Sequence, residues 1–267
     1  MKRARHSECE SRSDIAYRPH EPHMTKLSVN VNKIATLRNT RDIGIPSPLR
    51  AARLCLMAGA HGITVHPRPD ERHIRPADVN EIAELLAEFP EAEYNIEGNP
   101  FFDEFIRHCE RARPAQCTLV PDSLEQSTSD HGWNLAADGE RLRPLIAQLK
   151  CYGCRVSLFL DPNPEQVPLA REVGADRIEL YTAPFAEAFE HGPLGPVLES
   201  YRLTAEAAGR AGLGVNAGHD LSLDNLPVLI RHVPHLAEVS IGHALIAEAL
   251  EFGLPETVRR YLRVLSS

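Results

Sequence analysis

The stretch "AGAHGITV" (residues 58–65) decides the fold, because it joins the end of one regular element to the start of another. Its first glycine follows a segment of helical period, as a glycine at a helix end does, and "GITV" then reads as a short buried strand. The same junction returns in "YGCRVSL" (152–158), "VGADRIEL" (173–180) and "AGLGVNA" (211–217). This recurrence predicts an alternating α/β fold.

Eight short apolar runs alternate with segments of helical period along the chain. We expect strands at 27–32, 62–67, 93–98, 117–121, 155–161, 177–182, 214–219 and 238–243. The helix-like segments are 48–58, 76–89, 101–112, 139–152, 164–173, 197–211, 223–231 and 244–252. Eight strand–helix pairs favour a (β/α)8 TIM barrel over an open doubly wound sheet.

Length and composition agree with one globular barrel. The chain has 267 residues, of which 43% are hydrophobic and 25% charged. Its net charge of −8 disfavours a nucleic-acid partner, because such a protein needs an excess of basic residues to displace counterions from phosphates. Any anionic ligand must therefore be held by cations that are concentrated locally.

Residues 1–23 are charged and lack the apolar segment of a signal peptide. We expect them to form a disordered tail, followed by a single TIM-barrel domain over 24–267. No run approaches the roughly 18 apolar residues of a membrane span, so we expect a cytoplasmic protein without a membrane partner.

The cysteines include one close pair, Cys151 and Cys154, in the sequence "CYGC". A zinc site of this kind would need a second pair, which the sequence lacks. We therefore expect reduced structural thiols at these positions.

Polar residues, among them histidines and glutamates that can move protons, stand at the ends of the expected strands. In a TIM barrel the carboxyl ends of the strands form the active site. Histidine titrates near neutral pH, and an enclosed carboxylate can act as a base, so these residue types suit acid–base catalysis. They would also suit a metal, and a metal-dependent barrel isomerase or hydrolase acting on a phosphorylated sugar is the alternative. The residues are Asn30, Asn32, His66, Glu97, Glu179, His219 and His243.

Cations gather after two adjacent strands and indicate phosphate binding. The first group is Lys33, Arg38 and Arg41, and the second is Arg68, Arg72 and His73. Guanidinium groups match phosphate oxygens in pairs. In addition, "NAGHD" (216–220) and "IGHA" (241–244) place a glycine before a histidine, where barrels commonly present backbone N–H groups to a phosphate. The sequence thus predicts two phosphate sites.

The segment "DSLEQSTSDHGWNLAADG" (122–139) is too long for a simple connection between a strand and a helix. Loops of this length are commonly lids or binding loops. We expect a lid over the barrel mouth.

These landmarks resemble one family, the pyridoxine 5'-phosphate synthases of the deoxyxylulose-dependent vitamin B6 pathway. The similarity spans 27–262 and is carried by "VNVNKIATLRNTR", "AGAHGITVHPRPDERHI", "YNIEG", "CTLVPD", "VSLFLD", "IELYT", "VNAGHDL" and "IGHALI" in this order. The resemblance implies a transferase with a TIM barrel and extra helices that forms a homo-octamer without metal or organic cofactor. It would condense 3-amino-2-oxopropyl phosphate with 1-deoxy-D-xylulose 5-phosphate to give pyridoxine 5'-phosphate, inorganic phosphate and water.

The resemblance also implies roles for individual residues. His66 and Glu97 would accept protons, His219 would donate one, and Glu179 would stabilise a charged transition state. The other contacts fall into two sets. The aminoketone phosphate would be bound by Asn30, Arg41, Gly242 and His243, and the deoxyxylulose phosphate by Arg68, His73 and Thr128.

The sequence departs from the family pattern at three places. Asn32 and Lys33 stand where the family has Asp-His, so an amide and an ammonium group replace a carboxylate and an imidazole near the deoxyxylulose site. Asp220 stands where a glycine is usual and puts a negative charge beside a proposed phosphate site. Pro67 stiffens the backbone after His66 and removes no catalytic side chain.

Overall fold

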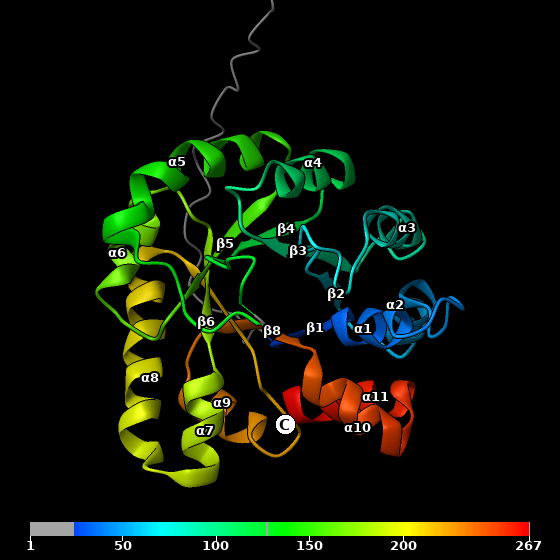
Figure 1. Ribbon diagram of the computed structural model, residues 1–267. Helices are drawn as coiled ribbons and strands as arrows, with labels where there is room; N and C mark the ends of the chain where they lie inside the picture. The colour runs from blue at the N-terminus through cyan, green and yellow to red at the C-terminus, as the bar shows by residue number, and fades with distance from the viewer. Residues whose placement is uncertain (1–23, 127, 267) are drawn as a thin grey trace, which may run out of the picture.

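Eight parallel strands close into a barrel in the computed structural model, which describes residues 24–126 and 128–266 (Figure 1). Each strand pairs with the next along the chain, and the last pairs with the first. The predicted TIM barrel is confirmed. Its strands are β1 (Lys26–Asn30), β2 (Gly62–Val65), β3 (Glu93–Gly98), β4 (Gln116–Leu119), β5 (Arg155–Leu160), β6 (Arg177–Tyr181), β7 (Gly214–Gly218) and β8 (Leu236–Ile241).

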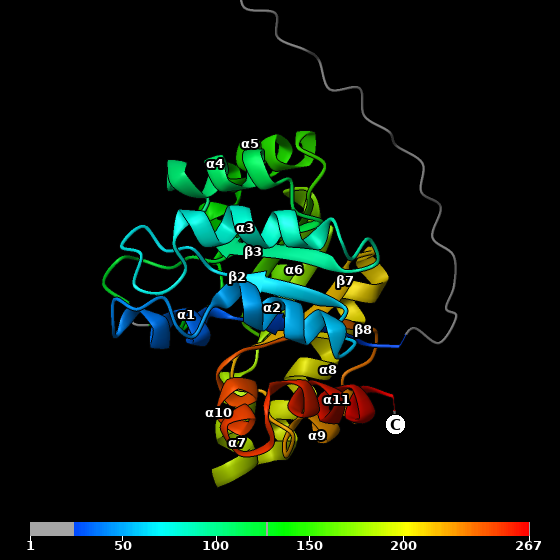
Figure 2. The same ribbon diagram turned by 90° about the vertical axis from the view of Figure 1, so that its right-hand side faces the viewer.

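Helices surround the barrel and cover the outer face of the sheet (Figures 1 and 2). Eight lie where helix-like segments were predicted: α2 (Pro48–Met57), α3 (Pro76–Leu86), α4 (Asp103–Ala112), α5 (Leu135–Cys151), α6 (Gln166–Glu172), α8 (Leu194–Ala211), α9 (Leu226–His232) and α10 (His243–Phe252). Three more are α1 (Asn32–Asn39), α7 (Ala183–His191) and α11 (Leu254–Leu265). The extra helices that the family resemblance implied are therefore present.

Helix α5 begins four residues before the predicted segment, at Leu135 rather than Gly139. The local sequence "AADG" (136–139) favours a turn, but Leu135 and Leu142 are buried on the inner face of the helix. Gly139 allows this face to approach the end of α6, because a Cβ at this position would lie 3.1 Å from Val173. Tertiary packing thus overrides the local turn preference, and the connection from β4 to α5 is shorter than expected.

Alternation along the strands separates an apolar outer layer from a polar barrel interior. Leu27 and Val29 are fully buried on the outer face of β1, against the helices. Between them, Ser28 faces inward and lies 2.6 Å from the Thr64 hydroxyl. Farther around the barrel, the Thr118 hydroxyl donates to Asn95 at 3.1 Å. The interior is thus a hydrogen-bonded polar lining rather than a hydrocarbon core.

Two other expectations concern the ends of the chain and the membrane. The predicted tail over 1–23 lies outside the described residues. In the part of the chain that the structure describes, no helix has the length and apolarity needed to cross a membrane.

Candidate active site

A cavity of about 360 Å³ opens at the carboxyl ends of the barrel strands. It is lined by all the site residues predicted from the sequence except the cations Arg38, Arg41 and Arg72. The predicted residues in the lining come from six of the eight strand ends and from the loop after β4. Four further residues line it that the sequence reasoning did not select, namely Val120, Ser129, Phe159 and Ser240.

The three cations predicted after the first strand lie in different surroundings. Lys33 lines the cavity, whereas Arg41 lies exposed beyond the end of α1. Arg38 is buried and forms an ion pair with Asp78 of α3, and it also donates to the His73 carbonyl at 3.0 Å. Arg38 therefore anchors the loop that carries His73, and the phosphate role of Arg41 stays a prediction.

His66 is a neutral, buried imidazole at the end of β2. Its backbone N–H donates to the Asn32 side chain at 2.9 Å, which ties it to the first turn of α1. Burial, together with the positive charges of Arg68 and Arg72, lowers the pKa of His66 to about 3. Its Nδ1 lies 3.8 Å from Glu97 Oε2. The ring is thus uncharged at neutral pH, but with this pKa it is a weak base until a nearby negative charge raises the pKa.

Glu97 and Glu179 are carboxyl groups enclosed by the barrel. Burial raises the pKa of Glu97 well above its usual range, and the charge of Glu179 raises it further. Burial, together with the charge of Glu238, raises the pKa of Glu179 to about 8. The Asn30 amide donates to Glu97 at 3.3 Å. Buried carboxyls that repel each other hold protons near neutral pH and are strong bases once ionised.

Two glycines leave room for these groups at the strand ends. A Cβ at Gly218 would lie 2.6 Å from Glu179 Oε1, and one at Gly242 would lie 3.2 Å from the Asn30 Cβ. Gly218 therefore admits the Glu179 carboxyl to the barrel mouth. Gly242 keeps the start of α10 close to the end of β1, which places His243, the first residue of that helix, at the cavity.

His219 contacts the lid as well as its own strand end. Its Nε2 lies 3.0 Å from the Thr128 hydroxyl, and its Nδ1 lies 3.0 Å from Asp220 Oδ2. Both His219 and Asp220 have positive φ, 86° and 58°, in the left-handed region that costs energy for residues with a Cβ. The Thr182 hydroxyl donates to the Gly218 carbonyl at 2.7 Å and so supports this strained turn.

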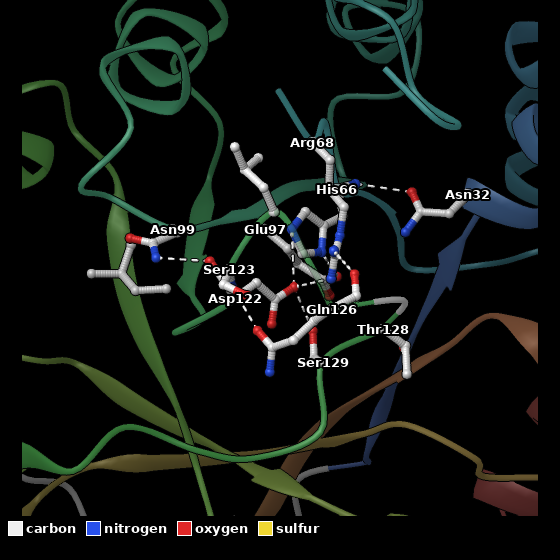
Figure 3. A network of polar contacts seen from close by, with 12 residues as sticks. Asn32, His66, Arg68, Glu97, Asn99, Asp122, Ser123, Gln126, Thr128 and Ser129 are labelled. Atoms are coloured by element: carbon white, nitrogen blue, oxygen red, sulfur yellow. Dashed lines mark hydrogen bonds and ion pairs between the residues drawn. The ribbon is translucent and has the colours of Figure 1, made fainter. Parts of the chain in front are cut away.

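The loop that carries Arg68 is fastened to the lid (Figure 3). Arg68 donates to the Gln126 carbonyl at 2.6 Å and forms an ion pair with Asp122. Arg72 donates to the carbonyls of Gln126 at 2.7 Å and Leu124 at 2.9 Å. Arg72 is therefore more than a solvated rim charge, because it binds the lid backbone.

Asp122 is a buried carboxylate that the sequence reasoning passed over. It directly follows "CTLVP", so the strand-end rule that selected the other residues could have found it. Its Oδ2 accepts from Ser129 at 2.9 Å and lies 3.6 Å from His66 Nε2. Burial raises the pKa of Asp122, and the positive charge of Arg68 offsets this only in part.

Metal binding and thiol chemistry find no support among the residues that the structure describes. Among residues 24–126 and 128–266, no group of three His, Cys, Asp or Glu side chains is arranged to hold a metal ion. Cys151 is exposed at the end of α5, and Cys154 is buried. A hydrogen bond to Cys117 and burial raise the pKa of Cys154, as expected for an unreactive structural thiol.

Fold and site together define a (β/α)8-barrel enzyme with an acid–base centre between cationic groups. Over residues 27–267 the chain matches the family model described as "Pyridoxal phosphate biosynthesis protein PdxJ", and it belongs to that family. Membership assigns the chain to pyridoxine biosynthesis.

Curated relatives with the name pyridoxine 5'-phosphate synthase cover nearly the whole chain. The protein from Albidiferax ferrireducens is 57% identical over 246 residues, which are 91% of this chain and 98% of the relative. The protein from Mesorhizobium japonicum is 55% identical over 89% of this chain and 97% of its own length. The protein from Xanthomonas campestris pv. campestris is 54% identical over 91% and 96%.

Solved structures with similar folds are distant in sequence. Tryptophan synthase from M. tuberculosis matches with a TM-score of 0.59 at 13% identity, over 91% of this chain and 93% of that chain. 3-Hexulose-6-phosphate synthase matches with a TM-score of 0.60 at 12% identity, over 90% and 99%. At such identities the likeness supports the barrel fold alone.

Proposed function

We propose that this chain condenses 3-amino-2-oxopropyl phosphate with 1-deoxy-D-xylulose 5-phosphate and releases pyridoxine 5'-phosphate, inorganic phosphate and water. One observation carries the proposal: a single cavity is lined by four acid–base groups, His66, Glu97, Glu179 and His219. Imine formation, phosphate elimination and ring closure each move a proton at a different atom, so one acid–base group cannot serve every step.

The two phosphates are assigned to two separate sets of residues. Arg68, His73 and Thr128 take the phosphate of the sugar, because Arg68 supplies a guanidinium fork. Asn30, Arg41, Gly242 and His243 take the phosphate of the aminoketone, for which the start of α10 supplies backbone N–H groups. Asn32 and Lys33 lie on the side of the deoxyxylulose substrate, and Asp220 completes the substrate-binding lining beside a phosphate.

Substrate charges adjust the basicity of the site. A phosphate dianion beside Arg68 offsets the positive charge that lowers the pKa of His66, so binding makes His66 a stronger base. The ammonium group of the aminoketone lowers the raised pKa of Glu97 by charge attraction, and the ionised Glu97 then takes a proton from it. His219 donates a proton to the leaving group. Positive charge that develops on the substrate lowers the raised pKa of Glu179, and the ionised Glu179 stabilises the cationic transition state.

The lid protects the imine from water. Thr128 contacts His219, so the loop after β4 reaches across to the end of β7 at the cavity mouth. Exclusion of water strengthens every charge interaction in the cavity and slows hydrolysis of the imine.

The reaction as proposed needs neither a metal ion nor an organic cofactor. Protein treated with a chelator and given both substrates should form pyridoxine 5'-phosphate and release phosphate in equal amounts. Loss of turnover on chelation, with recovery on adding a divalent ion, would favour the metal-dependent isomerase or hydrolase. Tight binding of both phosphates without any product would indicate a binding protein.

We further propose a cytoplasmic homo-octamer. Met57 on α2 and Leu250 on α10 are 71% and 82% exposed, so these large apolar side chains are available for contacts between subunits. Light scattering coupled to size-exclusion chromatography should give the mass of eight chains. A monomer mass at micromolar concentration would contradict the assembly.

A further inference from the structure

Asp122 joins three parts of the molecule through one residue (Figure 3). The residue lies just after β4 and is 4% exposed. Its Oδ2 binds Arg68, which belongs to the loop after β2, and accepts from Ser129 of the lid at 2.9 Å. Its backbone carbonyl accepts from Asn99, after β3, at 3.0 Å. The contact with Asn99 thus holds the backbone of Asp122 in place. The Asp122 carboxylate connects the loop after β2 to the lid.

The contacts of Arg68 determine which of its N–H groups remain for a ligand. Nη2 binds Asp122 and Nη1 donates to the Gln126 carbonyl at 2.6 Å. A guanidinium carries five N–H groups in a fixed plane, so these two contacts leave Nε–H and one N–H on each terminal nitrogen for a ligand. Because the plane is rigid, fixing two of its groups orients the other three.

The charge balance also points to a functional role. Arg68 is 6% exposed, and a buried guanidinium without a counter-ion is unstable. Asp122 supplies this counter-ion, yet its Oδ1 is buried without a hydrogen-bond partner. The carboxylate therefore pairs with both Arg68 and Ser129 through Oδ2 alone, which fixes the guanidinium relative to the lid.

We propose that Asp122 is a positioning residue that fastens the lid to Arg68 and so holds the guanidinium fork in the orientation that binds the phosphate of the sugar substrate. Asp122 does not touch the reacting atoms. It acts through Arg68 on one side and through Ser129 on the other. The inference rests on the proposed function and deepens it, because it assigns a specificity determinant to the sugar phosphate site.

The first test separates the two substrates kinetically. Asp122→Asn keeps the shape and removes the charge, so the KM for deoxyxylulose phosphate should rise about 10- to 100-fold, as expected when a hydrogen bond to a charged group is lost. The KM for the aminoketone phosphate and kcat should change by less than about threefold. A purely structural role would not separate the two KM values. Asp130→Asn, at an exposed carboxylate of the same loop, keeps an acceptor for the Gln126 side chain and does not contact Arg68. It is the matched control and should leave both values unchanged.

The second test measures how readily a protease cleaves the lid, and it does not depend on turnover. Glu125 is exposed in the lid, so a glutamate-specific protease followed by mass spectrometry measures cleavage after this residue. Asp122→Asn and Asp122→Ala should be cleaved about tenfold faster than the unaltered chain, whereas Asp130→Asn should not. Absence of turnover in the unaltered chain would refute the proposed function while this test still stands. Unchanged cleavage and an unchanged KM for the sugar phosphate in Asp122→Asn would overturn the positioning role.

Discussion

Glu93 and Glu97 stand on the same strand, β3, and face the same barrel interior from opposite ends. Glu93 accepts from Lys26 at 2.6 Å and pairs with Arg155. Burial alone would raise its pKa, but the hydrogen bonds to Arg155 and Lys26 outweigh this and lower it to about 2. Glu97 lies instead near the like charge of Glu179, and burial and this charge raise its pKa.

The two ends of the barrel therefore use buried charge differently. At the amino end, opposite charges neutralise each other, because Arg177 lies 3.6 Å from Glu238. Arg177 also donates a hydrogen bond to Asn216 at 2.9 Å. Gln116 donates to Glu238 at 3.1 Å and completes the network. At the carboxyl end, like charges are enclosed together at a cost in stability, which proteins tolerate where the groups do chemistry. The amino end stabilises the barrel, and the carboxyl end carries the proposed reaction.

The largest effect is expected for the histidines at the carboxyl end. His66→Asn and His219→Asn should each lower turnover by roughly two to four orders of magnitude, the usual contribution of a general acid or base. His61, just before the amino end of the strand that leads to His66, accepts from the Leu27 N–H at 3.1 Å. His61→Asn preserves an acceptor and should keep near-native turnover in the same steady-state assay. Near-native turnover in His66→Asn would remove its assigned role.

Breaking the amino-end network should affect stability instead. Arg177→Met leaves the buried Glu238 without its cation, so the free energy of unfolding should fall by roughly 2–4 kcal/mol. Urea unfolding measures this loss. Turnover per folded molecule should stay within about twofold of the unaltered chain. A large loss of turnover in fully folded Arg177→Met would show that the amino-end network also contributes to catalysis.

Arg68 extends the comparison between the two barrel ends, because it is a buried cation that lies at the carboxyl end. Arg68→Ala should raise the KM for deoxyxylulose phosphate about 10- to 100-fold, since a charged hydrogen bond to the phosphate is lost. Arg72→Ala, which removes contacts to the lid backbone and to Asp70, should have a smaller effect. Equal KM values for Arg68→Ala and the unaltered chain would contradict the proposed phosphate site.

The two ends should also differ in how stability depends on pH. The pKa of Glu93 is lowered to about 2, so its stabilisation is present above its unfolded pKa of 4.5 and is lost as pH falls toward 2. The pKa of Glu179 is raised to about 8, so the native state holds the extra proton and stability falls as pH rises from 4.5 to 8. Each carboxyl contributes a slope of at most about 1.4 kcal/mol per pH unit.

Thermal unfolding between pH 2 and 9 separates these two contributions. Glu93→Gln should flatten the acid part of the profile, and Glu179→Gln the part between pH 5 and 8. Identical profiles for Glu179→Gln and the unaltered chain would show that the pKa of this carboxyl is not raised by folding.

The barrel was predictable from sequence because its signals are local. Strand and helix periods, and the glycines between them, repeat along the chain. The strand-end rule selects His66, Glu97, Glu179 and His219 from the sequence alone, and all four line the cavity. The additional helices α1, α7 and α11 were missed as separate elements, because their segments follow strands or helices without a clear break in period.

The remainder of the site depends on partners that are distant in sequence. In the sequence, Arg38 is a candidate phosphate-binding cation. In the structure, Asp78, which lies 40 residues away, neutralises its charge. Asp122 is important because Arg68, 54 residues away, is buried against it. Burial and pairing of this kind arise from the closed barrel, and no local pattern records them.

One measurement tests the division between the two ends most directly: turnover and urea unfolding of Glu93→Gln and Glu97→Gln side by side. Glu97→Gln should lose at least about 100-fold in turnover and be as stable as the unaltered chain or more so. Glu93→Gln should keep its turnover within about twofold and lose roughly 1–3 kcal/mol of stability, because Lys26 and Arg155 lose their counter-ion. Near-native turnover in Glu97→Gln, or a catalytic loss in Glu93→Gln without loss of stability, would contradict the account.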